Sequence, residues 1–144
     1  MDDRTYEHLM VEPMAGALGC EVSGVELDKP IRPEIVSEIN AAFMDYLVIV
    51  FRDQTLTPYQ LLDFATQLGE PMEYPQTKGL PECPLVTPVV KLENETVNFG
   101  GVWHSDTTYL YRPPKASLLY AIEVPPAGGD TIFSNQYLAY ETLS

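Results

Sequence analysis

A histidine and an aspartate stand two residues apart in the segment over residues 102–107, and this pair suggests chemistry most clearly. On an extended strand, side chains at positions i and i+2 point to the same face, with Cα atoms about 6.6 Å apart. The His104 imidazole and the Asp106 carboxylate can then reach one ion. One histidine and one carboxylate are two of the three protein ligands in the two-His-one-carboxylate site of non-haem Fe(II). No histidine follows His104, so the expected third ligand does not come from the rest of this chain.

A simpler interpretation of this segment is a histidine that is hydrogen-bonded to its neighbour at the end of a strand, because HxD triplets are frequent. The residues around the triplet favour metal binding. Trp103 and Thr107 are expected on the opposite face, where Trp103 can pack into a core. Glycines just upstream of the triplet allow a close approach of the backbone.

A second segment of interest is Gly128-Gly129-Asp130-Thr131. Paired glycines followed by aspartate are typical of a turn, and from composition alone the turn is the favoured interpretation. Thr131 is the candidate functional residue of this segment. It is the first residue of the next predicted strand, and its hydroxyl can donate a hydrogen bond to a bound carboxylate.

Composition narrows the class of protein. The chain has 144 residues and a formal net charge of −13, which fits one acidic globular domain and disfavours nucleic-acid binding. The N-terminus shows no signal peptide, and no apolar run is long enough to span a bilayer. Cys20 and Cys83 are far apart in sequence and are expected to be reduced structural thiols. Together these features predict a cytoplasmic protein.

The predicted elements place Thr131 at the start of a strand and the His104 segment between two predicted strands. Helices are expected after Pro33 and after a capping box formed by Thr57, Pro58 and Gln60, with Gly69 at the end of the second helix. Ser134 or Asn135 is expected to cap a final helix. A long loop is expected from residue 70 to 84, and strands are predicted over residues 46–51, 85–91, 115–124 and 131–133.

Several motifs follow one another in an order that resembles a known family. They are residues 101–109, which contain His104 and Asp106, then Pro113-Pro114, residues 117–121, residues 125–131 and residues 137–143. In this order they resemble the taurine and 2,4-dichlorophenoxyacetate dioxygenase family of Fe(II)- and 2-oxoglutarate-dependent oxygenases. Residues 18–27 and 48–54 resemble the opening strands of the same family, so the resemblance covers nearly the whole chain.

The resemblance implies a mainly β or α+β fold: a double-stranded β-helix, or jelly roll, of the clavaminate-synthase type, with flanking helices. His104 and Asp106 would be the first two iron ligands, and Thr131 would bind the cosubstrate 2-oxoglutarate. The family's distal histidine and its 2-oxoglutarate-binding arginine lie further along than residue 144. Residues 1–144 are therefore expected to be the N-terminal part of a single, apparently truncated dioxygenase domain.

The reaction implied by the resemblance is hydroxylation of a small organic substrate by O₂, with release of succinate and CO₂. Tyr74 stands where the taurine enzyme has a sulfonate-binding histidine, and Gly100 stands where it has an asparagine, so taurine is not the favoured substrate. Candidate substrate contacts are Tyr74, Asn98 and Val102. A sulfonate, a sulfate ester or a carboxylate fits the resemblance.

Two other classes of function remain open from the residues alone. One is a non-catalytic jelly-roll module that binds a partner or ligand, and the other is an acidic fragment that folds only with a complementary chain. The presence of His104, Asp106 and Thr131 together favours the enzyme. The isolated 144-residue chain is expected to have little or no activity, and its oligomeric state, including a homo-oligomer, is not determined by the sequence.

Overall fold

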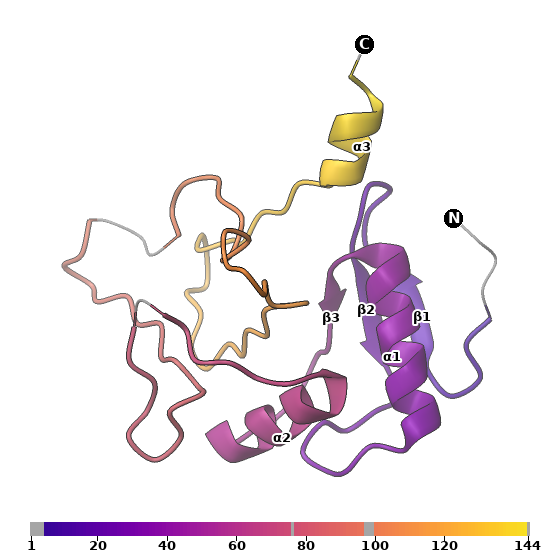
Figure 1. Ribbon diagram of the computed structural model, residues 1–144, viewed down its shortest axis with the longest axis horizontal. Coiled ribbons are helices and arrows are strands. Elements are labelled where there is room, and N and C mark those ends of the chain that lie inside the picture. The colour runs from indigo at the N-terminus through magenta and orange to yellow at the C-terminus, as the bar shows by residue number, and fades with distance from the viewer. Residues whose placement is uncertain (1–4, 76, 97–99, 144) are drawn as a thin grey trace.

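The computed structural model describes residues 5–75, 77–96 and 100–143. Its ordered centre is a three-stranded sheet of β1 (Met10–Pro13), β2 (Cys20–Ser23) and β3 (Ile49–Val50), in the order β1-β2-β3. β1 is antiparallel to β2, and β3 is parallel to β2. The helix α1 (Pro33–Tyr46) packs against this sheet (Figure 1), and its residues Ile39 and Ala42 are fully buried.

The predicted first helix is confirmed, but the strand predicted over residues 46–51 is only partly formed. Tyr46 is the last residue of α1. Leu47 adopts a left-handed conformation (φ 66°) and donates its N–H to the Phe43 carbonyl at 2.8 Å. This hydrogen bond ends the helix, so the first residues of the apolar run belong to a helix terminus. Only Ile49 and Val50 pair with β2.

The second helix, α2 (Pro58–Leu68), begins at the predicted capping box. Gln60 N–H donates to Thr57 Oγ1 at 3.3 Å, and Thr57 N–H donates to Gln60 Oε1 at 2.9 Å. Phe64 is buried and packs edge-on against Phe51, with ring centroids 5.8 Å apart. Gly69 ends the helix as expected.

The strands predicted over residues 85–91, 115–124 and 131–133 are not formed among the described residues. A strand requires a ladder of hydrogen bonds to a neighbouring strand, and among the described residues these segments have none, although Leu80 N–H donates to the Val86 carbonyl at 2.9 Å. Many of their apolar side chains are consequently exposed, Ile122 to 89% and Leu119 to 75%. Trp103, expected in a core, is 71% exposed, so that prediction was wrong in this structure.

The segment over residues 115–120 is nevertheless attached to the N-terminal layer. Leu118 packs against the core cluster that contains Ile39 and Phe64. The Tyr120 hydroxyl accepts a hydrogen bond from Leu56 N–H at 3.1 Å and donates to the Gln54 carbonyl at 3.3 Å. The helix α3 (Gln136–Glu141) follows further along, capped by Asn135 as predicted. No helix within the described ranges is long and apolar enough to cross a membrane.

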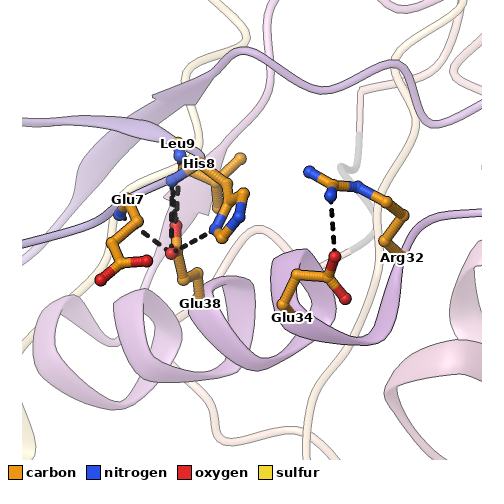
Figure 2. Close-up of polar contacts among 6 residues, drawn as sticks. All are labelled: Glu7, His8, Leu9, Arg32, Glu34 and Glu38. Carbon is orange, nitrogen blue, oxygen red and sulfur yellow. Dashed lines mark hydrogen bonds and ion pairs between the residues drawn. The ribbon is translucent and has the colours of Figure 1, made fainter.

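A carboxylate on α1 joins the helix to the segment before β1. Glu38 accepts hydrogen bonds from the backbone N–H groups of Glu7, His8 and Leu9, at 2.9 to 3.3 Å. It also lies 2.9 Å from His8 Nδ1. Figure 2 shows these contacts converging on one side chain, and the separate ion pair of Arg32, the residue before α1, with Glu34 in the first turn of the helix.

Both cysteines are buried free thiols, as expected. Burial raises the pKa of Cys20 to about 11, with Asp45 adding to the shift. Since the thiolate is the reactive form, we expect iodoacetamide at pH 8 to leave Cys20 unmodified in the folded protein and to alkylate it after unfolding in guanidinium. Peptide mass spectrometry measures this, and rapid labelling of Cys20 in the native chain would contradict the buried placement.

Candidate metal centre

The structure brings the side chains of His104 and Asp106 together. His104 Nε2 lies 3.1 Å from Asp106 Oδ1, and the two side chains are 51% and 49% exposed. The segment that carries them is bent and is not a strand. The imidazole and the carboxylate therefore lie close together, as the spacing predicts. The backbone, however, is not the regular strand that was expected.

The orientation of the imidazole is set by the backbone two residues earlier. His104 Nδ1 lies 2.8 Å from the Val102 carbonyl oxygen. A carbonyl only accepts, so Nδ1 carries a proton and Nε2 is the nitrogen that faces Asp106. This hydrogen bond, together with the Asp106 carboxylate, raises the pKa of His104 above its usual value. Two arrangements give both Nε2 and Oδ1 a partner. In the first, a proton on Nε2 forms a hydrogen bond to Oδ1; in the second, a metal ion binds to both atoms.

The orientation of the carboxylate is set by a residue from another segment. Ser117 Oγ donates to Asp106 Oδ2 at 2.9 Å. This hydrogen bond occupies one carboxylate oxygen and leaves Oδ1 directed at His104. Each side chain of the pair thus has one atom held by the protein and one atom directed at its partner, an arrangement that is typical of metal ligands.

The backbone turns immediately after the pair. Thr107 is 5% exposed and has a φ of 43°, in the left-handed region. A β-branched residue rarely adopts this conformation, and such strain is common where a site must hold side chains in a set orientation. Its carbonyl accepts from Leu110 N–H at 3.1 Å, which closes the turn. Thr107 therefore redirects the chain directly beyond Asp106.

The donor pair fits a first-row divalent metal. Two bonds of about 2.1 Å at a right angle separate their donor atoms by about 3.0 Å. The observed separation of Nε2 and Oδ1 is 3.1 Å. An imidazole nitrogen with a carboxylate oxygen also matches the ligand types of non-haem Fe(II). Among the described residues, no group of three His, Cys, Asp or Glu side chains could hold a metal, so the fit is to two of the three protein ligands.

The remaining predicted site residues are not joined to the pair by side-chain contacts. Thr131 is exposed, Tyr74 is half-buried in the loop after α2, and no hydrogen bond within the described ranges connects either of them to His104 or Asp106. The Val102 side chain is 78% exposed, and this residue contributes its carbonyl to His104. Asn98 lies outside the described residues.

Ser117 is the site residue that the sequence interpretation missed. Its only sequence signal is its place beside Leu118 in the predicted strand, where neighbouring side chains point to opposite faces. Gly100 matches the expectation of close backbone approach near the triplet. A Cβ at Gly100 would lie 3.1 Å from His104 Cε1, and its φ is 68°.

We expect Gly100→Ala to weaken metal binding at the pair by roughly 10-fold, because strain of about 1–2 kcal/mol and the added methyl group both displace the His104 ring. Trp103 is the only tryptophan of the chain and neighbours His104, so Co(II) quenching of its fluorescence measures the affinity. Gly128→Ala is the matched control: Gly128 also has a positive φ (78°), but a Cβ there meets nothing within 4 Å. Equal affinities in the two variants would contradict the placement of Gly100 against the imidazole.

Comparison with known proteins identifies the family of the chain. Residues 10–144 match the model described as "Taurine catabolism dioxygenase TauD, TfdA family". The chain is 35% identical over 136 residues to the alpha-ketoglutarate-dependent sulfate ester dioxygenase of Pseudomonas putida, covering 94% of this chain and 44% of the relative. It is 28% identical over 152 residues to the alpha-ketoglutarate-dependent 2,4-dichlorophenoxyacetate dioxygenase of Cupriavidus pinatubonensis, covering 94% and 53%.

A solved structure is also similar to part of the chain. A taurine dioxygenase from Burkholderia xenovorans superposes with a TM-score of 0.51 and 32% sequence identity, over 54% of this chain and 28% of that protein. The chain spans about half the length of the curated relatives it matches.

Proposed function

Because this chain belongs to the TauD, TfdA dioxygenase family, we propose that the protein is an Fe(II)- and 2-oxoglutarate-dependent dioxygenase that hydroxylates a small organic molecule. The observation that supports this most directly is the 3.1 Å approach of His104 Nε2 to Asp106 Oδ1, in the motif that resembles the family's ligand triplet. Dioxygenases of this family use Fe(II), 2-oxoglutarate and O₂.

The proposal assigns a role to each residue of the site. His104 and Asp106 hold the iron, and the Asp106 charge offsets part of the charge of the divalent ion. The Thr131 hydroxyl donates a hydrogen bond to a carboxylate of 2-oxoglutarate. When bound, iron and 2-oxoglutarate supply the oxidising chemistry: one atom of O₂ enters succinate as CO₂ leaves, and the other enters a substrate C–H bond.

The proposed fold of the whole domain is the jelly roll, with residues 1–144 as its N-terminal part. The three-stranded sheet with α1 and α2 is its entry layer. The extended segments over residues 115–124 and 131–133 are strands that acquire neighbours when the domain is complete. Their exposed apolar side chains support this, because an apolar surface of this extent is normally covered in a folded domain.

The proposed substrate class is a small sulfate ester, sulfonate or carboxylate. Relatives with 35% and 28% identity are named for a sulfate ester and for an aryloxyacetate. Tyr74, Asn98 and Val102 are the proposed substrate contacts. A tyrosine at position 74 offers a phenol hydroxyl as a hydrogen-bond donor to an anionic head group, which differs from the imidazole expected in the taurine enzyme.

The test is a screen for succinate release by the protein expressed from the reading frame that encodes this chain. The protein is supplied with Fe(II), ascorbate and 2-oxoglutarate under air, and sulfate esters, sulfonates and aryloxyacids are compared. We expect substrate-dependent succinate formation that is lost when Fe(II) is replaced by Zn(II). Absence of succinate with every substrate class, in a protein that binds Fe(II) and 2-oxoglutarate, would refute the proposed activity.

A further inference from the structure

We propose that Ser117 is a positioning residue of the metal centre, whose hydroxyl orients the Asp106 carboxylate for metal binding. The inference rests on the proposed function, since it concerns how the same site is held. Ser117 itself would not contact the metal. It acts through Asp106, by fixing which carboxylate oxygen faces His104.

The hydrogen bond between Ser117 and Asp106 is the contact that ties the donor pair to another segment. Ser117 Oγ lies 2.9 Å from Asp106 Oδ2, across eleven residues of sequence. The remaining polar contacts of the pair are local: His104 Nδ1 with the Val102 carbonyl, and His104 Nε2 with Asp106 Oδ1. Within the part of the chain that the structure describes, no second hydrogen bond or ion pair connects His104 or Asp106 to a distant residue.

Ser117 is itself held by the N-terminal layer through its neighbours. Leu118 packs against the core cluster, and the Tyr120 hydroxyl bonds the backbone at Leu56 and Gln54. In an extended segment, alternate side chains point to opposite faces. Leu118 and Tyr120 therefore face the core, while Ser117 faces away from it and meets Asp106.

Through Ser117, the hydrophobic core is connected to a donor pair that few other contacts hold in place. His104 and Asp106 are about half exposed and lie on a bent segment without strand pairing. Without Ser117, the carboxylate would be restrained only by its contact with His104, a neighbour on the same bent segment. The Ser117 hydroxyl donates to Oδ2, so Oδ1 is the oxygen beside Nε2 and the one that would be available to a metal. Loss of an outer hydrogen bond of this kind typically costs 10- to 100-fold in metal affinity.

The test is a Co(II) titration of the full chain, followed by quenching of Trp103 fluorescence and by the visible absorption of bound Co(II). Three variants are compared with the parent: Ser117→Ala, Ser117→Thr and Ser134→Ala. Ser117→Ala removes the hydroxyl, Ser117→Thr keeps it, and Ser134→Ala removes an exposed hydroxyl that does not contact the pair. Thermal unfolding of each variant reports whether the fold is retained.

We expect Ser117→Ala to weaken Co(II) binding by about 10-fold or more and to alter the Co(II) absorption spectrum, with Ser117→Thr and Ser134→Ala close to the parent. An unchanged affinity and spectrum in Ser117→Ala would overturn the inference while leaving the metal site intact. Failure of Ser117→Thr to restore binding would also overturn it, because the hydroxyl would not be the active group. A parent protein that binds no Co(II) near Trp103 would instead refute the proposed metal centre itself.

Discussion

In the protein expressed from the reading frame that encodes this chain, replacement of Asp106 by alanine is expected to abolish metal binding at the pair and all 2-oxoglutarate-dependent turnover. The variant removes both the Oδ1 donor and the negative charge that a divalent ion requires at neutral pH. A loss of more than about 100-fold in affinity is expected, since removal of an outer hydrogen bond alone costs 10- to 100-fold. Quenching of Trp103 by Co(II) measures the affinity, and succinate formation with Fe(II) measures turnover.

The matched control is Asp63→Ala, which removes an aspartate side chain from α2, away from the pair. It lowers the net negative charge by the same amount, so it corrects for any general attraction of cations to an acidic protein. Iron-dependent succinate formation that survives in Asp106→Ala, with Asp63→Ala unchanged, would remove Asp106 from the ligand set.

Replacement of Glu38 by alanine is expected to lower the free energy of unfolding by about 2–3 kcal/mol. The Glu38 side chain is 17% exposed and accepts from three consecutive backbone N–H groups and the His8 ring. Its removal leaves the partly buried N–H groups of His8 and Leu9, and the exposed N–H of Glu7, without their acceptor. Chemical denaturation followed by circular dichroism measures the loss. Glu34→Ala is the control on the same helix, because the exposed ion pair of Glu34 with Arg32 contributes about 1 kcal/mol at most.

The contribution of Glu38 also depends on pH. Burial by itself raises the pKa of Glu38, but the hydrogen bonds from His8 and from the backbone of Glu7 outweigh it and hold the pKa below its usual value. A carboxyl group with a lower pKa in the folded state stabilises the fold at pH values above its unfolded pKa. That stability is lost as the pH falls through the folded value. The stability difference between the parent and Glu38→Gln should therefore shrink on acidification below pH 4.5; a constant difference would contradict the role of the charge.

The helices were predictable from the sequence because their signals are local. The capping box of Thr57 and Gln60 forms within four residues, and Pro33 occupies the first position of α1. The apolar run after residue 45 was less well predicted. Apolar residues occur both in a buried strand and in the last turn of a helix, so the run does not show where one ends and the other begins. In the structure the boundary is the left-handed residue Leu47.

The strands beyond residue 84 depend on neighbours that a local pattern does not specify. Residues 115–124 alternate as a strand should, yet the described chain provides no pairing partner for them. The exposure of Trp103 has the same cause, because its expected core is built by strands that are not paired here. Alternation predicts which side chains share a face, and pairing decides whether that face is covered.

The candidate site was partly predictable, because one of its contacts is local in sequence and another is tertiary. The spacing of His104 and Asp106 is enough to bring two side chains to one ion, and the structure places their donor atoms 3.1 Å apart. The contact from Ser117 is a tertiary one, and it depends on how Leu118 and Tyr120 attach their segment to the core. The roles of Thr131 and Tyr74 remain predictions from resemblance.

The central claim is that His104 and Asp106 bind one ferrous ion through Nε2 and Oδ1. Its most direct test is a crystal structure of the protein with Mn(II) and 2-oxoglutarate, in which anomalous scattering locates the metal. We expect one manganese at about 2.1–2.2 Å from both atoms. A metal bound to only one of the two side chains, or bound elsewhere with the two heads turned apart, would contradict it.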